Sequence, residues 1–476
     1  MSTGDADDGT AMRVDLRALA RTGTVHFVGI AGAGMSAIAE LLLRSGGRVS
    51  GCDTHPGSVG DMLAGLGARI STGHDAAHAS DAVAVVTTAA VPPGHPELEA
   101  ARSRGIPVVK RAQALGSIVN RGTLIAIAGT HGKTTTTAMT TAILAEAGLD
   151  PTGFVGGQVT AWASGLRPGS DTLFVVEADE YDRSFMALLP TTAVVTSVEA
   201  DHLDIFGTAA HVEDAFRRFI ALVPPHGMVA ACTDDAGVRR IIVDRQGTLT
   251  YGTTAAARLR AERIEAQGRT SRFVVQLEGA RLGEMTVNAP GLHNVRNALG
   301  AFAAASRAGA GFDAARRALA DFTGVARRMQ ELGTFHEITV IDDYAHHPTE
   351  ISVTLAACRT MHPGRPIVAV FQPHLYTRTR DFAAAFGSAL AAADAVWVAG
   401  IYPAREAPIE GVHGGLIAAA AQSAGARAAR YVQGVEQIAQ DVFGTLRPRD
   451  VVLFMGAGDI DRAARAIVDL LRRSPS

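Results

Sequence analysis

The feature that most constrains the fold is the segment IAIAGTHGKTTTT, in which an apolar, strand-like run meets a glycine-rich turn and then a threonine-rich run. Gly129 and Gly132 permit a tight turn whose backbone N–H groups face an anion, and a helix that begins near Lys133 adds positive partial charge there. Lys133 would reach terminal phosphates, and the hydroxyl of Thr134 would face Mg²⁺. The first glycine of the longer phosphate-loop pattern would fall at Ile127, so this is a shortened variant. The alternative, a glycine turn that only packs a helix on a sheet, does not explain GK followed by four threonines.

Composition supports a chemical role for this lysine and excludes several partners. Lys110 and Lys133 are the only lysines among 476 residues. A net charge of -3 and an aromatic share of 5% provide neither a basic surface nor a stacking platform, so we expect no nucleic-acid partner. No apolar run reaches the ~18 residues of a membrane span, and the acidic leader MSTGDADDGTAM has no apolar core, so we expect a cytoplasmic chain without a membrane partner. The cysteines lack the paired spacing of a zinc or disulfide framework and are expected to be small buried side chains: Cys52, Cys232 and Cys358.

The order of apolar runs and helical patterns predicts an α/β protein of three domains, which also suits the length at about 150 residues per domain. Residues 1–120 begin with a strand, a glycine turn, a helix and a second strand, which is typical of a Rossmann-like domain. Residues 121–328 contain the phosphate loop and form the largest domain, with a small antiparallel excursion expected between Ala255 and Pro290. Residues 329–476 repeat the strand-then-helix order as a second Rossmann-like domain.

Two acidic clusters, FVVEADEYDRSF and TSVEADHLD, come directly after apolar runs. Sites in α/β sheets lie at strand ends, and Mg²⁺ prefers carboxylate oxygens close to phosphates. Glu177 or Glu180 would therefore supply a ligand. Two roles stay open for His202: it would either lie in the ligand shell of the ion or be a hydrogen-bonded loop histidine. The remaining acids are expected to be solvated or capping side chains: Asp179, Asp182 and Asp201.

The first domain contains a second glycine turn, GIAGAGMSAIA, followed by a strand that ends at Asp53. The spacing is close to that of a dinucleotide-binding fingerprint, and taken alone it suggests NAD. A turn of this type cradles the diphosphate of another nucleotide equally well. A glycine pair that packs a helix against the sheet is the structural alternative. The motif therefore indicates a diphosphate more specifically than it indicates nicotinamide.

Polar segments in the third domain also follow strands, at DDYAHHPTE and FQPHLYTRTRD. Arginine matches a carboxylate in two hydrogen bonds, so Arg378 and Arg380 near Tyr344, His346 and His347 would make a cationic pocket for a carboxylate. A basic surface loop is the alternative. In the central domain GLHNVRNAL has two polar residues at helical spacing that would contact a base or merely cap and pack the helix: His293 and Asn297.

Ten motifs in this order resemble the Mur ligases of peptidoglycan synthesis, over nearly the whole chain: GIAGAGM, AGTHGKTTT, EADEYDRSF, VEADHLD, GLHNVRNAL, GVARRMQELG, DDYAHHPTE, FQPHLYTRTRD, YPAREAPIEG and GAGDI. FQPHLYTRTRD and YPAREAPI resemble the L-alanine-adding branch more than the recycling branch that adds a whole peptide. The resemblance implies that the first domain holds a UDP-sugar, the second ATP and the third the amino acid.

The resemblance also implies residue roles. It implies that Lys133, Glu177 and His202 are catalytic and that Mg²⁺ is held by Thr134, Glu177 and His202. The implied ATP site comprises Gly129, Thr130, His131, Gly132, Lys133, Thr134, Thr135, His293, Asn297, Arg328 and Asp343. The implied UDP-substrate site comprises Gly29, Ala31, Gly32, Ala33, Gly34, Met35, Ser36 and Asp53. The implied amino-acid site comprises Tyr344, His346, Arg378 and Arg380.

The implied reaction transfers the γ-phosphoryl of ATP to the carboxylate of UDP-N-acetylmuramate, after which L-alanine attacks the acyl phosphate. ATP, L-alanine and the UDP-sugar are thus the expected small-molecule partners of a monomer or dimer. The chain departs from the family at three positions, with Ser197 for asparagine, Met329 for phenylalanine and Ala345 for glycine, none of which removes an expected charge or ligand. Several relatives use a carbamylated lysine, but no lysine follows Lys133 here. The alternatives are the peptide-adding ligase, an NAD-dependent dehydrogenase and a non-catalytic nucleotide switch.

Overall fold

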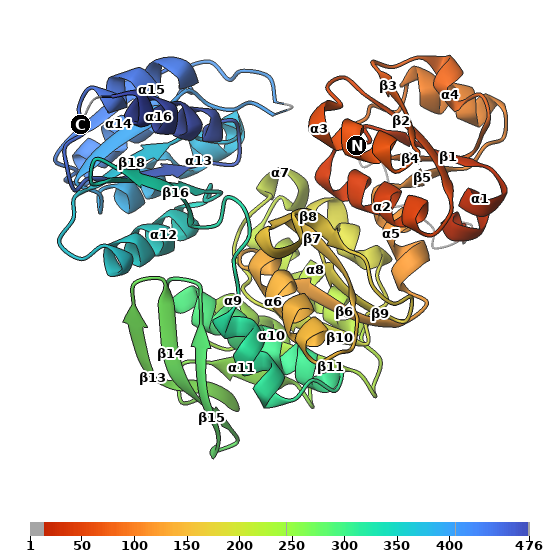
Figure 1. Cartoon of the computed structure of the whole chain (residues 1–476), viewed down its shortest axis with the longest axis horizontal. Helices are drawn as coiled ribbons and strands as arrows, with labels where there is room; N and C mark the ends of the chain where they lie inside the picture. Colours follow the sequence, from red (N-terminus) through yellow and green to blue (C-terminus); the bar gives the residue numbers. More distant parts are fainter. Residues whose placement is uncertain (1–13, 244, 405, 475–476) are drawn as a thin grey trace.

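The computed structural model describes residues 14–243, 245–404 and 406–474, which form three β-sheets, each covered by helices (Figure 1). In Figure 1 the N-terminal sheet lies at the upper right in red, the C-terminal sheet at the upper left in blue, and the central sheet below them. The predicted α/β fold of three sheet-based units is confirmed. The acidic leader lies outside the described residues.

The first sheet is parallel, in the order β3-β2-β1-β4-β5, which is the order of a doubly wound nucleotide-binding half. The order reverses between β1 and β4, so the glycine turn that follows β1 lies at the switch point. Its strands are β1 (Thr24–Val28), β2 (Arg48–Asp53), β3 (Arg69–Thr72), β4 (Ala82–Thr87) and β5 (Val108–Lys110). Its helices are α1 (Leu16–Thr22), α2 (Ala33–Arg44), α3 (Gly57–Gly65), η1 (Ala76–Ala79), α4 (Pro96–Ser103) and α5 (Arg111–Val119).

The central sheet places β6 between β10 and β9, in the order β15-β14-β13-β12-β11-β10-β6-β9-β7-β8. The expected antiparallel excursion is formed by β13 to β15. The strands are β6 (Thr123–Ala128), β7 (Thr152–Val159), β8 (Ser164–Arg167), β9 (Leu173–Glu177), β10 (Thr192–Val195), β11 (Met228–Cys232), β12 (Leu249–Gly252), β13 (Leu259–Gln267), β14 (Thr270–Leu277) and β15 (Ala280–Val287). The helices are α6 (Lys133–Glu146), η2 (Thr160–Trp162), η3 (Tyr181–Ala187), α7 (Leu203–Phe206), α8 (Ala209–Ala221), α9 (Ala236–Ile242), α10 (Leu292–Arg307) and α11 (Phe312–Ala320).

The third sheet has the order β16-β17-β21-β18-β19-β20 and is parallel except for the β16–β17 pair. Its strands are β16 (Gln330–Phe335), β17 (Ile338–Asp343), β18 (Ile367–Phe371), β19 (Ala395–Ala399), β20 (Ala429–Val432) and β21 (Val451–Met455). Its helices are α12 (Pro348–Met361), α13 (Tyr376–Leu390), α14 (Gly415–Ser423), α15 (Val435–Phe443) and α16 (Asp461–Arg473).

The apolar core ties the first two units together more closely than the third. One cluster, from Leu16 to Ile241, joins the first sheet to one face of the central sheet, because α2 packs against β7 and β8. The two faces of the third sheet have cores of their own. Within the described ranges, no helix is both long and apolar enough to cross a membrane. The boundaries expected near residues 121 and 328 fall in the connections between sheets and stay predictions.

Candidate nucleotide and ligation site

The turn after β6 has the backbone geometry of an anion cradle. Gly129 and Gly132 have φ angles of 141° and 81°, in the left-handed region that favours glycine. A Cβ at Gly129 would lie 2.0 Å from Oγ1 of Thr196, and a Cβ at Gly132 would lie 2.6 Å from Oδ1 of Asn297. Both positions therefore require glycine, and α6 begins at Lys133 as the sequence predicts.

Lys133 lies folded over this turn. Its Nζ donates to the carbonyls of Gly129 (2.6 Å) and Thr130 (3.2 Å) and to Oε1 of Glu180 (3.0 Å). Burial alone would lower the pKa of Lys133, but Glu180 and its acidic neighbours outweigh burial and raise it, so the lysine stays charged. An ammonium held by two carbonyls at a helix N-terminus can exchange them for phosphate oxygens.

Thr134 and Glu177 come together as the expected Mg²⁺ pair, because β9 runs next to β6. Oγ1 of Thr134 donates to Oε1 of Glu177 at 3.0 Å, and the N–H of Gly156 donates to Oε2 at 2.7 Å. A hydroxyl and a carboxylate beside a phosphate loop are hard oxygen donors, so these residues fit Mg²⁺. Nε2 of His202 instead lies 3.9 Å from Oε1 of Glu180 and 3.8 Å from Oδ2 of Asp201. Glu180 pairs with the lysine, so of the two expected acids Glu177 is the one next to the threonine.

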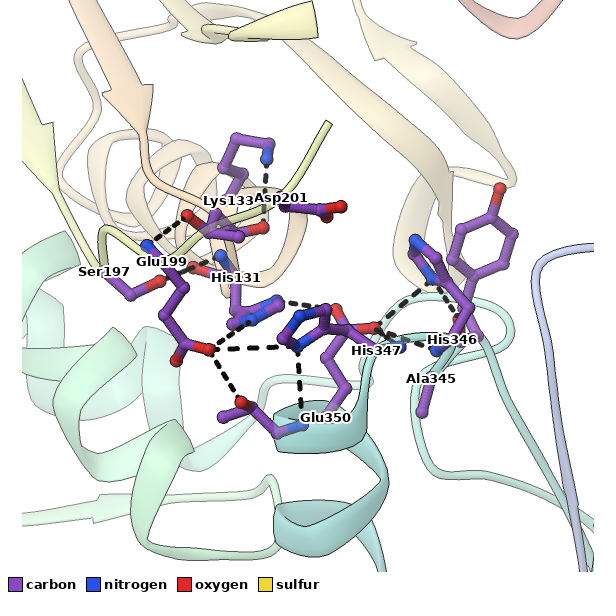
Figure 2. A network of polar contacts seen from close by, with 12 residues as sticks. His131, Lys133, Ser197, Glu199, Asp201, Ala345, His346, His347 and Glu350 are labelled. Carbon is purple, nitrogen blue, oxygen red and sulfur yellow. Dashed lines mark hydrogen bonds and ion pairs between the residues drawn. The ribbon is translucent and has the colours of Figure 1, made fainter. Parts of the chain in front are cut away.

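The phosphate loop contacts the third domain through a network of imidazoles and carboxylates (Figure 2). Nδ1 of His131 donates to Oε1 of Glu350 at 3.1 Å, and its Nε2 lies 3.7 Å from Oε2 of Glu199. The rings of His131 and His347 are 5.0 Å apart, and Nδ1 of His347 lies 3.8 Å from Glu199. The hydroxyl of Thr349 donates to Glu199 at 2.7 Å. Neither Glu199 nor Glu350 was expected at the site from the sequence, although each lies in an acidic or polar motif after a strand.

This network predicts a pH-dependent contact between the two domains. Burial alone would lower the pKa of His131, but Glu350 and Glu199 outweigh it and raise the pKa from 6.5 to about 9. A group with a raised folded-state pKa contributes stability that is fully present below pH 6.5 and is lost as the pH rises through 9. We expect His131→Gln to lower Tm relative to wild type at pH 6.5, and we expect this decrease in Tm to become smaller as the pH rises towards 9.5.

Thermal unfolding of wild type and His131→Gln across this pH range measures the difference directly. His226→Gln, at an exposed histidine of the same domain, is the control and is expected to show no such trend. A Tm difference for His131→Gln that stays constant from pH 6.5 to 9.5 would contradict the assigned pKa.

A cavity of about 210 Å³ lies between the phosphate loop, α10 and the start of the third domain. His293 lines it and is neutral, because burial and nearby Arg296 lower its pKa to about 4. Asp343 accepts hydrogen bonds from the N–H groups of Met329 (2.7 Å) and Ala345 (2.8 Å), so it fixes the chain that enters this domain. Seven of the expected ATP-site residues line this one cavity: His131, Gly132, Thr135, His293, Asn297, Arg328 and Asp343.

Arg378 and Arg380 do not meet in one pocket. They lie two residues apart on α13, and side chains at this spacing point to different sides of a helix. Arg378 is buried and pairs with Asp201 of the central domain, whereas exposed Arg380 pairs with Asp381. Burial would raise the pKa of Asp201, but Arg378 outweighs it and holds it below the usual range. The expectation that Asp201 is solvated or capping is therefore wrong.

His346 lies beside Glu350 at the third-domain end of the network, with its Nδ1 3.3 Å from Oε2 of Glu350 (Figure 2). Burial lowers the pKa of His346 to about 3, so the ring is neutral, and its Nδ1 donates to the carbonyl of Tyr344 at 2.9 Å. The guanidinium of Arg328 stacks on the ring of Tyr344 at 5.2 Å. An aromatic ring and a partly buried arginine thus lie at the junction of the two domains.

The glycine turn after β1 is held in place by Asp53, the acid at the end of β2. Oδ2 of Asp53 accepts from the N–H of Ala31 at 3.1 Å. Arg111, which was not expected here from the sequence, reaches across the turn so closely that a Cβ at Gly34 would lie 2.8 Å from its Nη1. Arg111 and Tyr181 also line a cavity of about 1040 Å³ between the first two domains. None of the expected UDP-substrate residues lines that cavity: Gly29, Ala31, Gly32, Ala33, Gly34, Met35, Ser36 and Asp53.

All three family departures take part in the site's hydrogen bonding, and Met329 and Ala345 do so by donating their backbone N–H groups to Asp343. The hydroxyl of Ser197 accepts from the N–H of His131 at 2.9 Å, and its carbonyl accepts from the N–H of Thr130 at 2.9 Å. Serine at this position therefore still holds the phosphate loop.

Together these features define a three-domain α/β enzyme built around a phosphate loop. Family models match it along its length as "Mur ligase family, catalytic domain" (residues 24–123), "Mur ligase middle domain" (127–305) and "Mur ligase, glutamate ligase domain" (327–458). The chain belongs to the Mur ligase family. The NAD-dependent dehydrogenase alternative finds no support in this family of ligases.

Individual relatives agree along the full length. The chain is 45% identical to the UDP-N-acetylmuramate–L-alanine ligase of Salinibacter ruber, over 95% of this chain and 96% of that protein. It is 44% identical to the enzyme of the same name from Acidothermus cellulolyticus, over 96% of each chain. The fold is similar to the crystal structure of UDP-N-acetylmuramate–alanine ligase from Thermotoga maritima, with a TM-score of 0.82 at 29% identity, 95% coverage of this chain and 100% of that one. A murein peptide ligase from Psychrobacter arcticus is similar at 25% identity and a TM-score of 0.71, with the same coverage.

Proposed function

We propose that this chain joins L-alanine to the carboxylate of UDP-N-acetylmuramate, with cleavage of ATP, in peptidoglycan precursor synthesis. The observation that carries the proposal is the phosphate loop with Lys133, Thr134 and Glu177 beside a cavity that the third domain closes. Full-length similarity to proteins named UDP-N-acetylmuramate–L-alanine ligase supports this choice of substrates. The cytoplasmic location and the oligomeric state stay predictions.

In the proposed reaction the muramyl carboxylate attacks the γ-phosphorus of ATP, and ADP leaves. The amine of L-alanine then attacks the acyl phosphate, loses a proton, and inorganic phosphate leaves with the bonding electrons. Mg²⁺, when bound, would neutralise phosphate charge beside Thr134 and Glu177. Lys133 would hold the transferring phosphoryl group, because phosphoryl transfer depends mainly on positioning and charge stabilisation.

The proposed residue roles follow the domain in which each side chain lies. Neutral His293 and Asn297 would contact the nucleotide base, and Arg328 would contact the nucleotide from the domain junction. Tyr344, His346 and Arg378 would orient L-alanine, and the turn from Gly29 to Ser36 with Asp53 would hold the UDP diphosphate.

Phosphate release from ATP with Mg²⁺ and UDP-N-acetylmuramate tests this function, with L-alanine, the recycling tripeptide or no acceptor added. We expect release that depends on L-alanine, and an amide product of matching mass. Preference for the tripeptide would instead favour the peptide-adding branch, to which the murein peptide ligase belongs by name. ATP binding without release under any acceptor would identify a nucleotide switch and overturn the proposal.

A further inference from the structure

The first domain contains a buried cluster of metal-binding side chains that the proposed ligase reaction does not use. His26 lies on β1, Cys52 on β2 and Glu97 on α4, and their ligand atoms lie within 4.8 Å of one another. Their exposed fractions are 1%, 0% and 0%. Three ligand-type residues from three separate elements therefore converge at one point inside the domain.

The separations in this cluster are close to those of one tetrahedral ion. Nε2 of His26 and Sγ of Cys52 each lie 3.0 Å from Oε2 of Glu97. Nδ1 of His74, which lies outside this group of three, is 3.2 Å from Sγ of Cys52 and 3.5 Å from Oε1 of Glu97, so rotation of this partly exposed ring would bring it in as a fourth ligand. Ligand atoms around one zinc ion, bonded at about 2.0–2.3 Å, stand roughly 3.3–3.8 Å apart. Small side-chain shifts would open the cluster around an ion.

The surroundings orient the cluster and connect it to solvent. Nδ1 of His26 is hydrogen bonded to the hydroxyl of Ser50 at 2.9 Å, the kind of partner that fixes the ring of a metal-ligating histidine. His74 and His78 keep 28% and 23% of their side chains exposed, which gives an ion a route inward. Nδ1 of His95, whose ring lies edge-on to His74 at 4.6 Å, is buried and has no hydrogen-bond partner among the described residues.

We propose that His26, Cys52, His74 and Glu97 form a structural zinc site. Four protein ligands leave no open position, which is the arrangement of a structural rather than a catalytic zinc. In the metal-free chain Cys52 is a protonated thiol whose S–H donates to Glu97. Burial raises the pKa of this thiol, and the neighbouring carboxylate of Glu97 raises it further. Zinc would displace this proton to solvent and take the sulfur as thiolate.

Zinc at Cys52 would also brace the expected UDP loop. The carbonyl of Cys52 accepts hydrogen bonds from the N–H groups of Gly29 (2.8 Å) and Ile30 (3.0 Å). The next residue, Asp53, holds the N–H of Ala31. Holding β2 in place at Cys52 would therefore also hold the turn that follows the neighbouring strand, β1.

Titration of the chelator-treated full-length chain with Co²⁺ tests the site, because tetrahedral Co²⁺ absorbs in the visible and a bound thiolate adds a charge-transfer band in the near ultraviolet. We expect both features to saturate at one ion per chain and to disappear when Zn²⁺ is added. Cys52→Ser should lose the charge-transfer band, whereas Cys358→Ser, at another buried cysteine, should keep it. Zn²⁺ should raise the Tm of wild type by about 5 °C and leave Cys52→Ser unchanged.

Two results would overturn the site. One is a wild-type spectrum without the thiolate band. Tetrahedral Co²⁺ bound only at the second cluster of potential ligands, His131, Glu199 and His347, would give this result, because that cluster has no cysteine. The other is a thiolate band that survives in Cys52→Ser. If Cys52→Ser does not fold, X-ray absorption of the zinc-loaded wild type decides, since a shell of nitrogen and oxygen without sulfur contradicts the proposal. None of these readouts depends on ligase activity.

Discussion

Replacing Lys133 with methionine is expected to lower L-alanine-dependent phosphate release by about 10³-fold or more, while binding of the UDP-substrate is retained. The Nζ of this lysine lies against the carbonyls of the phosphate turn. Charge placed at a transferring phosphoryl group is worth roughly 10³–10⁵-fold in rate. Methionine keeps the length and apolar stem of the side chain, so the loss reports charge more than packing.

The stability of this variant needs its own control, because removing Lys133 leaves Glu180 buried without its cation. An uncompensated buried charge typically costs about 3–5 kcal/mol. Lys133→Met combined with Glu180→Gln removes both charges, and we expect it to recover Tm but not turnover. Activity restored in the double variant would show that Lys133 acts only by neutralising Glu180.

The phosphate loop and the pairing of Thr134 with Glu177 could be predicted because neighbouring strands carry these residues. β6 ends in the loop and β9 ends at Glu177, so pairing of the two strands places Glu177 beside Thr134. The acidic motif after β10 reaches the loop in the same way. Strand-end motifs in a parallel sheet meet at one edge whatever their separation along the chain.

Contacts between domains could not be predicted in this way. The pairs His131–Glu350 and Arg378–Asp201 depend on how the third domain packs against the central one, and local pattern carries no signal for that. Spacing was also misleading at Arg380, because both arginines were expected in one cationic pocket, whereas α13 begins at Tyr376 and turns the two side chains apart.

The cluster around Cys52 shows a second limit. Its members are separated by up to 71 positions, from His26 to Glu97, and none forms a paired-cysteine pattern. The expectation that the three cysteines are buried is confirmed. Burial alone does not distinguish an inert cysteine from one beside an imidazole and a carboxylate, and only the fold of the first sheet brings these groups together.

Arg378→Ala is expected to raise the KM for L-alanine by about 10–100-fold, with a smaller effect on the KM for ATP. A charge-assisted hydrogen bond to a carboxylate is worth about 1.5–3 kcal/mol, which converts to this range. Arg378 is buried at the junction with the central domain, where its guanidinium contacts Asp201. We infer that the carboxylate of L-alanine competes for this guanidinium.

The variant Asp201→Asn distinguishes a role of Arg378 in binding alanine from a role in holding the two domains together. It breaks the same ion pair but leaves Arg378 in place. If Arg378 binds the substrate carboxylate, steady-state kinetics should show a much larger KM for L-alanine in Arg378→Ala than in Asp201→Asn. Arg380→Ala, two residues away on the exposed side of α13, should have the smallest effect of the three. Equal KM increases in Arg378→Ala and Asp201→Asn would mean that Arg378 only holds the third domain against the central one. A large effect at Arg380 would mean that α13 rotates on binding alanine and would restore the pocket of two arginines that the sequence predicted.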